Sequence, residues 1–338
     1  MKRLRILALM HPQLVPPDSL DGQTEKDINT WKTEFDVVHA LRELGHEVQP
    51  LGVQYELLPI RDAVEQFKPH VVFNLLEEFH GEVLYDQNVV SLLELLKVSY
   101  TGCNPRGMII SRGKALSKKL LAYHRIRVPD FAVFPMGRKV KRPSRLAFPL
   151  IVKSLIEHAS VGIAQASVVD SDEKLAERVR FIHERVGTDA IAEQFIEGRE
   201  LYVSVIGNER LAAYPAWELV AEKRTDDAPL IATAKVKHDI EYQARHGIDI
   251  RAADLAPEQA AKLAHVAKRI YKILELTGYA RIDFRLGGDG QFYFLEANPN
   301  PEIAEREEFA SAAKAAGVSY PQLLQRIVSL GMRPDRPE

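Results

Sequence analysis

The stretch that decides the fold is residues 280–298, which read ARIDFRLGGDGQFYFLEAN. Two strand-like segments flank a turn, and the Asp-Gly pair in its middle favours a two-residue hairpin turn. With that turn, Asp283 lies opposite Glu296 and Arg281 lies opposite Asn298, so the four side chains share one face of the hairpin. The other face is predicted to belong to the core and carries Ile282, Phe284, Leu286, Tyr293, Leu295 and Ala297.

The polar face of this hairpin has two interpretations. Opposed carboxylates destabilise a sheet unless a positive charge lies between them. Asp, Glu and Asn offer hard oxygen ligands, the set that suits Mg²⁺ when it is shared with phosphates of a substrate. The alternative is a surface hairpin on which Arg281 neutralises both acids. The pattern alone leaves both interpretations open.

The composition is that of a globular protein. The chain has 338 residues, of which 46% are hydrophobic and 27% charged, and its formal charge is -2. These values exclude disordered, collagenous and disulfide-scaffold classes and predict two or three domains. The near-neutral charge predicts no nucleic-acid partner. The single cysteine, Cys103, favours a reducing compartment, and no apolar run approaches the ~18 residues of a membrane span, so we expect a cytoplasmic protein without a membrane partner.

The first hundred residues alternate between strand and helix patterns, which predicts a small parallel sheet with crossover helices. The expected strands and helices, in chain order, are Leu4–Met10, Trp31–Leu44, Glu47–Leu51, Leu58–Phe67, His70–Leu75 and Val89–Leu96. The polar, proline-containing segment from His11 to Asn29 is predicted to be a loop on the functional edge of this sheet.

The remainder of the chain predicts two α+β units. The expected elements are a helix over Met108–His124, strands over Phe148–Ser154, Ala164–Val169, Ala190–Phe195, Glu200–Ile206 and Leu211–Tyr214, a helix over Ser171–Val186 with Ser171 as N-cap, and a helix over Glu258–Leu276. The predicted boundaries are an N-terminal domain over 1–104, a central subdomain over 105–220 and a C-terminal subdomain over 221–338.

Five motifs in one order carry a family resemblance. Residues 280–298 resemble the metal-binding end of ATP-grasp enzymes, and more closely that of the D-alanine–D-alanine ligase branch. The other four motifs are residues 73–102, Lys114 with LSKK at 116–119, FPLIVKS at 148–154 and AEQFIEGRE at 192–200. The resemblance implies an α/β (α+β) ATP-grasp fold, in which a small parallel-sheet domain precedes two α+β subdomains that enclose ATP.

The resemblance also implies nucleotide-binding roles for Lys114, Lys153, Ser160, Gly162, Glu193, Gln194, Phe195, Ile196, Glu200 and Lys237. The lysines would contact phosphates, the loop with Ser160 and Gly162 would close over them, residues 193–196 would receive adenine, and Glu200 would accept the ribose hydroxyls. Lys235 is the rival of Lys237. A surface-edge lysine is the alternative for Lys153, and a solvated helix face is the alternative for Lys114.

The implied catalytic centre lies on the hairpin. Asp283, Glu296 and Asn298 would hold Mg²⁺, with Mn²⁺ as a substitute, and Arg281 would stabilise the tetrahedral intermediate. His80 resembles the family's histidine near the first substrate, but Tyr85 stands where an acid is expected, and a surface-loop histidine is the alternative. Cys103 is assigned no chemistry.

The implied activity is that of an ATP-dependent carboxylate–amine ligase. A small-molecule carboxylate would take the γ-phosphate to give an acyl phosphate, and an amine would displace phosphate to give an amide, with release of ADP. The alternatives are D-alanine–D-alanine ligation itself, a non-catalytic ATP-binding module and a Mg²⁺-dependent hydrolase. A homodimer is a family-level expectation.

Two departures from the family pattern predict different substrates. The segment 11–29 lacks the family's glycine-rich motif and is expected to recognise the carboxylate substrate. After Asn298, residues 299–308 read PNPEIAEREE, so that Glu302 replaces a glycine and no hydroxyl residue appears before Ser311. This acidic run predicts an acceptor with an extra amine, or with a masked or distant carboxylate, rather than free D-alanine. The alternative is that these acids cap a helix N-terminus.

Overall fold

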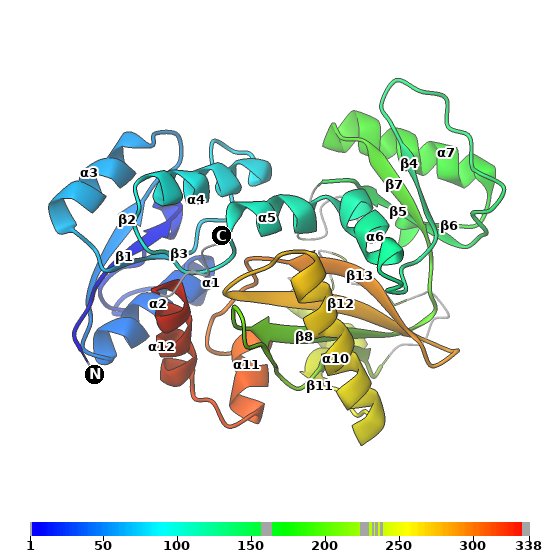
Figure 1. Cartoon of the computed structure of the whole chain (residues 1–338). Coiled ribbons are helices and arrows are strands. Elements are labelled where there is room, and N and C mark those ends of the chain that lie inside the picture. Colours follow the sequence, from blue (N-terminus) through cyan, green and yellow to red (C-terminus); the bar gives the residue numbers. More distant parts are fainter. Residues whose placement is uncertain are drawn as a thin grey trace.

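The computed structural model of the chain describes residues 2–156, 164–223, 230, 231, 233, 236 and 239–332, which form three sheets (Figure 1). The N-terminal sheet has the order β2-β1-β3 with parallel pairing. Its strands and surrounding helices are β1 (Arg5–Met10), α1 (Glu25–Thr30), α2 (Lys32–Glu43), β2 (Glu47–Gly52), α3 (Leu58–Phe67), β3 (Val71–Asn74) and α4 (Asp86–Leu95), with short 3-10 turns at Pro12–Leu14 and Val83–Tyr85. The predicted parallel sheet is therefore confirmed.

The segment that follows β1 is more ordered than the predicted loop. It holds the 3-10 turn and α1, and α1 begins with a capping box in which the Thr24 side chain accepts from the Asp27 amide at 3.2 Å. The Asp27 carboxylate in turn accepts from the Thr24 amide at 3.1 Å. These reciprocal bonds satisfy two donors at the helix start, which fixes the direction of α1.

The second sheet is antiparallel and has the order β4-β7-β5-β6. Its parts are α5 (Pro105–Arg112), α6 (Lys114–Tyr123), β4 (Phe131–Phe134), β5 (Leu150–Ser154), a 3-10 turn (Gln165–Ser167), β6 (Val168–Val169), α7 (Asp172–Phe181), a π-helical turn (Ile182–Val186) and β7 (Ala190–Gln194). The single helix expected before this sheet is broken at Gly113, which lies between α5 and α6. Ser171 caps α7 as predicted, since its hydroxyl accepts from the Lys174 amide.

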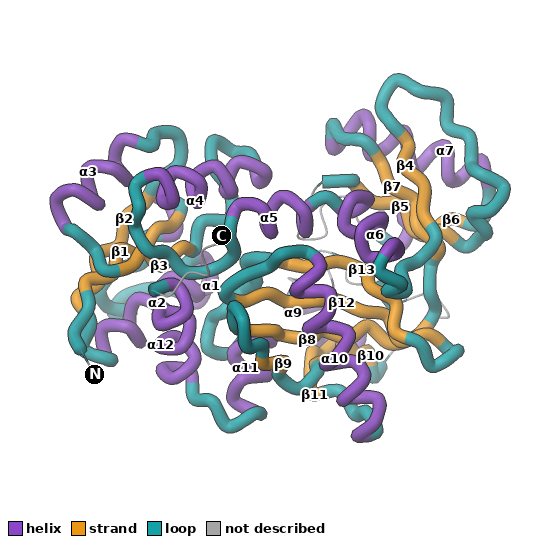
Figure 2. The backbone as a smooth tube through the Cα atoms, in the orientation of Figure 1, coloured by secondary structure: helices purple, strands orange, loops and turns teal. Residues whose placement is uncertain are grey.

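The third sheet has the order β11-β10-β8-β12-β13, and β9 pairs with β8. Its parts are β8 (Gly198–Ile206), β9 (Ala212–Ala213), β10 (Trp217–Ala221), α9 (Ile240–His246), β11 (Ile248–Ala252), α10 (Pro257–Ile273), β12 (Tyr279–Gly287) and β13 (Phe292–Asn298), followed by α11 (Glu308–Ala315) and α12 (Tyr320–Gly331). The backbone trace in Figure 2 shows α10 lying across the face of this sheet, where it covers a core that includes Phe284 and Phe294.

Sheet membership divides the chain differently from the expected boundaries. β8 precedes residue 220 and β10 begins before it, yet they pair with β12 and β11 in the third sheet. The change of sheet falls between Gln194 and Gly198. The chain end also returns to its beginning, because Leu323 and Ile327 of α12 share a core with Ile6 of β1 (Figure 1). Neither long-range pairing is encoded in local sequence patterns.

Among the described residues, no helix combines the length and the apolar character that crossing a membrane requires.

Candidate active site

The β12–β13 hairpin pairs the four polar residues as predicted. Asp283 lies opposite Glu296, and Arg281 lies opposite Asn298. The turn is one residue longer than predicted, because the Gly287 amide donates to Gln291 and Gly290 takes a positive φ of 70°. This three-residue loop shifts the register by one.

A bulge restores the predicted register at the polar end of the hairpin. It lies beyond Asp283, where Phe284 pairs with Phe294 and leaves Leu295 as the extra residue. The longer turn and the bulge each shift the register by one residue, and the two shifts cancel at Asp283 and Glu296. Between the turn and the bulge only the first shift applies. The predicted core face is therefore wrong for Tyr293 and Leu295, and Phe292 and Phe294 are buried instead.

Arg281 and Asp283 form a buried pair at the centre of the polar face. Arg281 Nε and Nη2 lie 2.8 and 2.9 Å from the two carboxylate oxygens of Asp283. Glu308 lies 3.7 Å from the same guanidinium, and the ring of Tyr202 lies 5.0 Å from it. Burial opposes the charge of Arg281, but Asp283 and Glu308 raise its pKa well above the ordinary value. The alternative of a surface hairpin is wrong, since both residues of the pair are buried.

The oxygen donors on this face fit a magnesium ion. Asp283 and Glu296 contribute carboxylates from adjacent strands, and Asn298 contributes an amide whose oxygen accepts from the Asn300 amide at 3.0 Å. No group of three or more His, Cys, Asp or Glu side chains suited to a metal occurs in the described part of the chain. Mg²⁺, however, usually takes only one or two protein carboxylates and completes its shell with water and phosphate.

Three lysines, which we call the lysine cluster, lie beside this hairpin: the buried Lys114 and Lys118 and the half-buried Lys153. The Glu193 carboxylate lies 3.3 Å from both the Lys118 and the Lys153 ammonium groups. Lys118 also donates to the Leu295 carbonyl, so the bulge of β13 presents an acceptor to the cluster. The surface-edge interpretation of Lys153 and the solvated-face interpretation of Lys114 are therefore both wrong.

The electrostatics of the lysine cluster differ from residue to residue. Burial lowers the pKa of Lys114 to about 8, although Glu296 and Glu193 oppose that effect. Burial also disfavours the charge of Lys153, but Glu193 and Glu296 outweigh it and raise its pKa. The pKa of Glu193 is lowered, because Lys118 and Lys153 outweigh the cost of its burial. The three lysines thus have Glu193 and Glu296 as neighbouring carboxylates, and their positive charges can also stabilise a bound anion.

Lys118 lies within the LSKK motif quoted in the sequence analysis, but no role of its own was predicted for it. It lies four positions after Lys114 on α6, so both side chains share one face of that helix. The four-residue spacing from Lys114 was the sequence feature that could have indicated Lys118. Its contact with Glu193 joins segments far apart in the chain, so the spacing could not predict that contact.

Glu200 and the segment before it lie where the second sheet gives way to the third. The Glu200 carboxylate accepts from Tyr202 at 3.1 Å and lies 3.0 Å from Arg285. The amides of Gln194 and Phe195 donate to the carbonyls of Asp130 and Pro149. The side chain of Glu193 points to the lysine cluster, so the adenine role expected of residues 193–196 remains a prediction for their backbone groups.

Several predicted residues lie outside the described part of the chain or outside this arrangement. Ser160, Gly162, Lys237 and its rival Lys235 are outside the described residues. His80 is exposed and packs edge-on against Tyr55, with ring centroids 5.1 Å apart. Cys103 is buried, and burial raises the pKa of its thiol to about 12, in keeping with the absence of an assigned role.

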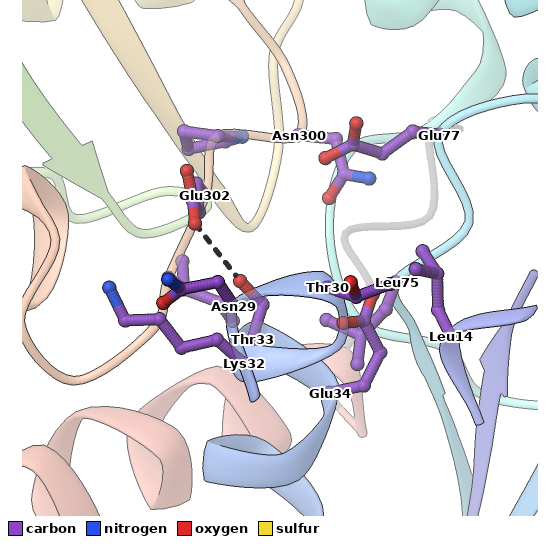
Figure 3. Close-up of a pocket in the computed structure, with 12 residues that line it drawn as sticks. Leu14, Asn29, Thr30, Lys32, Thr33, Glu34, Leu75, Glu77, Asn300 and Glu302 are labelled. Carbon is purple, nitrogen blue, oxygen red and sulfur yellow. Dashed lines mark hydrogen bonds between the residues drawn. The ribbon is translucent and has the colours of Figure 1, made fainter. Parts of the chain in front are cut away.

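A cavity of about 220 Å³ lies between the N-terminal sheet and the segment after β13. Figure 3 shows three carboxylate side chains around it, Glu34 from α2, Glu77 after β3 and Glu302 after β13. We call this the acidic cavity. Leu14 of the segment 11–29 also lines it. The structure therefore brings the segment expected to recognise the carboxylate substrate and the acidic run expected to face the acceptor onto one cavity.

Comparisons with known proteins agree with the fold. Residues 120–329 match the family model described as D-ala D-ala ligase C-terminus. The chain is 35% identical to a D-alanine–D-alanine ligase of Bordetella petrii over 253 residues, which cover 74% of this chain and 73% of the relative. It is 31% identical to the D-alanine–D-alanine ligase of Aquifex aeolicus over 306 residues, 90% of this chain and 96% of the relative.

The fold comparison covers almost the whole chain. The crystal structure of a Bacillus anthracis D-alanine–D-alanine ligase complexed with ATP superposes with a TM-score of 0.74 at 22% identity, over 98% of each chain. The expected fold class is thereby confirmed, and it is that of the ATP-grasp carbon–nitrogen ligases. Within that class, the chain belongs to the D-alanine–D-alanine ligase family.

Proposed function

We propose that the protein is an ATP-dependent carboxylate–amine ligase that forms an amide bond through an acyl phosphate and releases ADP and phosphate. The observation that carries this proposal is the lysine cluster, in which Lys114 and Lys153 lie within the field of Glu296. Glu296 lies opposite Asp283 on the hairpin that also carries Asn298. Buried cations beside hard oxygen donors suit a metal-bound polyphosphate. Family membership supports the same activity.

Each group of residues has a separate task in this reaction. Lys114 and Lys153 neutralise phosphate charge, and Lys118 holds Glu193 and the Leu295 carbonyl in place. A Mg²⁺ ion held by Asp283, Glu296 and Asn298, or Mn²⁺ in its place, would balance the charge of the transferring phosphoryl group. Arg281, fixed by Asp283, stabilises the oxyanion that forms when the amine attacks the acyl phosphate.

The test is ADP release from the purified protein with ATP and Mg²⁺, measured against panels of carboxylates and amines. A ligase releases ADP only when both substrates are present, and the amide product appears in equal amount. Release with water alone would assign a hydrolase, and ATP binding without turnover in any combination would assign a binding module. Glu302 lines the acidic cavity, and its carboxylate favours an acceptor other than free D-alanine.

D-Alanine–D-alanine ligation is the second candidate, because the Bordetella petrii and Aquifex aeolicus relatives carry that name. An acceptor screen of D-alanine, basic amino acids, polyamines and amidated amino acids separates the two candidates. Efficient formation of the D-alanine dipeptide would assign the second. A homodimer and a cytoplasmic location remain predictions, and light scattering on the purified protein tests the former.

A further inference from the structure

The acidic cavity contains a buried carboxylate, that of Glu34, which has no partner side chain among the described residues. Glu34 is 6% exposed, lies in the first turn of α2 and lines the cavity. Among the described residues, no side chain forms a hydrogen bond or an ion pair with its carboxylate, which bonds only to its own backbone amide. Figure 3 shows this carboxylate turned toward the cavity. Burying a carboxylate without a counter-charge is costly, so such a group calls for a ligand.

Two further carboxylates face the same space from other parts of the chain. Glu302 accepts from the Thr33 hydroxyl at 3.3 Å, and Glu77 follows β3 on the opposite wall (Figure 3). Both residues are exposed by surface area, yet burial of the carboxyl group raises the pKa of each, so their charges carry a desolvation cost as that of Glu34 does. The chain thus contributes carboxylates from α2, from the end of β3 and from the segment after β13 to one cavity.

The nearby cations are already paired with other acids. Lys32 is the cationic side chain in the described lining of the cavity, and its ammonium lies 2.6 Å from Glu307. Arg112, which acts on Glu77 at longer range, is buried in an ion pair with Asp86. Among the described residues, Lys32 and Arg112 act on Glu302 and Glu77 only at longer range, and none pairs with Glu34, which leaves this carboxylate available to a bound cation.

We infer that the acidic cavity binds a non-reacting cationic group other than an α-ammonium, namely a terminal ammonium or guanidinium carried by one of the two substrates. The inference rests on the proposed ligase function, for which it names the substrate class as basic amino acids or diamines. Surrounding carboxylates keep such a group protonated, and a protonated amine has no lone pair with which to attack, so the group serves recognition. The volume of about 220 Å³ equals about seven water molecules, enough for a cationic head and part of its alkyl chain.

The ionisation of the cavity agrees with this assignment. Burial raises the pKa of Glu34 to about 7, with smaller effects from Glu77 and Glu302. Burial together with the charges of Glu307 and Glu308 raises the pKa of Glu302 to about 7, against a lowering effect of Lys32. A bound cation would favour the ionised form of each, so binding releases protons and tightens as the pH rises through 7.

The experiment is calorimetric titration of the full chain without ATP, using lysine and arginine as probes and norleucine as the probe that lacks the terminal charge, each in both enantiomers. We expect at least one basic probe to bind about tenfold more tightly than norleucine, and Glu34→Gln to abolish that preference without changing norleucine binding. Glu43→Gln, an exposed change on the same helix, is the matched control and should bind like the parent protein. Glu77→Gln, at a solvent-reached position, should reduce the preference in the same direction.

The results separate this inference from the proposed function. Equal affinity for basic probes and norleucine, or an undiminished preference in both Glu34→Gln and Glu77→Gln, would overturn the cation site. The ligase proposal is tested independently by ADP release. Amide formation confined to uncharged substrates overturns the cation site and leaves the ligase standing. Charge-dependent probe binding without ADP release for any pair leaves the cation site standing and removes the ligase.

Discussion

The lysine cluster and the acidic cavity each collect like charges inside the protein, but among the described residues only the lysine cluster has an oppositely charged side chain in contact with it. Lys118 and Lys153 share Glu193 at 3.3 Å, and Lys114 lies within the field of Glu296. Glu34 in the acidic cavity has no such partner side chain among the described residues. The consequence appears in their pKa values: that of Lys153 is raised and its charge favoured, whereas that of Glu34 is raised to about 7 and its charge disfavoured.

This difference in pairing indicates which kind of ligand each region can bind. A cation cluster that is held together by carboxylates keeps its geometry without a ligand and can receive phosphates with little rearrangement. A group of carboxylates whose neighbouring cations are paired with other acids is unfavourable until a further positive charge arrives, so it favours ligands that carry that charge. The first arrangement suits a nucleotide common to the family, and the second suits a substrate particular to this chain.

The largest expected effect concerns the hairpin that the lysine cluster faces. Glu296→Ala or Asn298→Ala removes an oxygen donor from the predicted metal site, so kcat for ADP release should fall by about 10³ or more. Glu258→Ala, an exposed change at the start of α10, is the control and should leave kcat unaltered. Circular dichroism checks that each variant folds. Parental activity in Glu296→Ala would rule out the metal assignment.

The next effect tests the lysine cluster as a phosphate site. Lys153→Ala removes a buried ammonium beside Glu193, so the dissociation constant for ATP should rise about 100-fold, measured by fluorescence titration or calorimetry. Lys174→Ala, an exposed lysine on α7, should bind ATP like the parent protein. Unchanged ATP affinity in Lys153→Ala would remove this residue from the nucleotide site.

A matched pair on α6 sharpens the same test. Lys118→Met leaves Glu193 with one partner fewer in a buried setting and should destabilise the protein by about 3 kcal/mol in urea unfolding. Lys119, the next residue, is exposed, and Lys119→Met should change stability by less than about 0.5 kcal/mol. Equal stabilities for the two variants would contradict the pairing of Lys118 with Glu193, on which the comparison of the lysine cluster with the acidic cavity rests.

The sequence could predict what depends on local pattern. The alternation over the first hundred residues predicted the parallel sheet, because each strand and helix has its own period. The pairing of Asp283 with Glu296 was predicted correctly although the turn was not, since the longer loop and the bulge at Leu295 offset each other. Alternation cannot reveal a bulge, and the assignments of Tyr293 and Leu295 were wrong for that reason.

The features that the sequence could not predict are those that join distant segments. The carboxylate of Glu193 meets Lys118 only after β7 and α6 pack together, and Glu34 meets Glu77 and Glu302 only after three separate segments converge. The acidic run after Asn298 could be recognised in the sequence, but the residues that lie near it in the fold could not. The sequence therefore predicted that Glu302 lies near the acceptor, but it did not predict the cavity that Glu302 shares with Glu34 and Glu77.

A smaller effect concerns the stability of the acidic cavity without a ligand. The folded-state pKa of Glu34 is raised to about 7 from an ordinary value of 4.5. The contribution of this carboxyl group to the free energy of unfolding is therefore most favourable below pH 4.5, and it is lost as the pH rises through 7. Glu34→Gln should therefore stabilise the protein by about 2–3 kcal/mol at pH 8 and by less than about 1 kcal/mol at pH 5, measured by urea unfolding at both pH values. Glu43→Gln should show no such pH dependence. A Glu34→Gln protein that is less stable than the parent at pH 8 would mean that the carboxylate has a structural partner.

The smallest expected effect decides which substrate reaches the acidic cavity. Leu14 lines the cavity from the segment 11–29, whereas Leu20 of the same segment is 40% exposed and does not. Leu14→Ala removes about three carbon atoms of apolar wall, so the KM for the carboxylate substrate should rise about threefold to tenfold while the KM for ATP stays constant. Leu20→Ala should change neither constant. A rise confined to the KM for the amine would show that this segment recognises the acceptor, and an unchanged KM for both substrates would place recognition elsewhere.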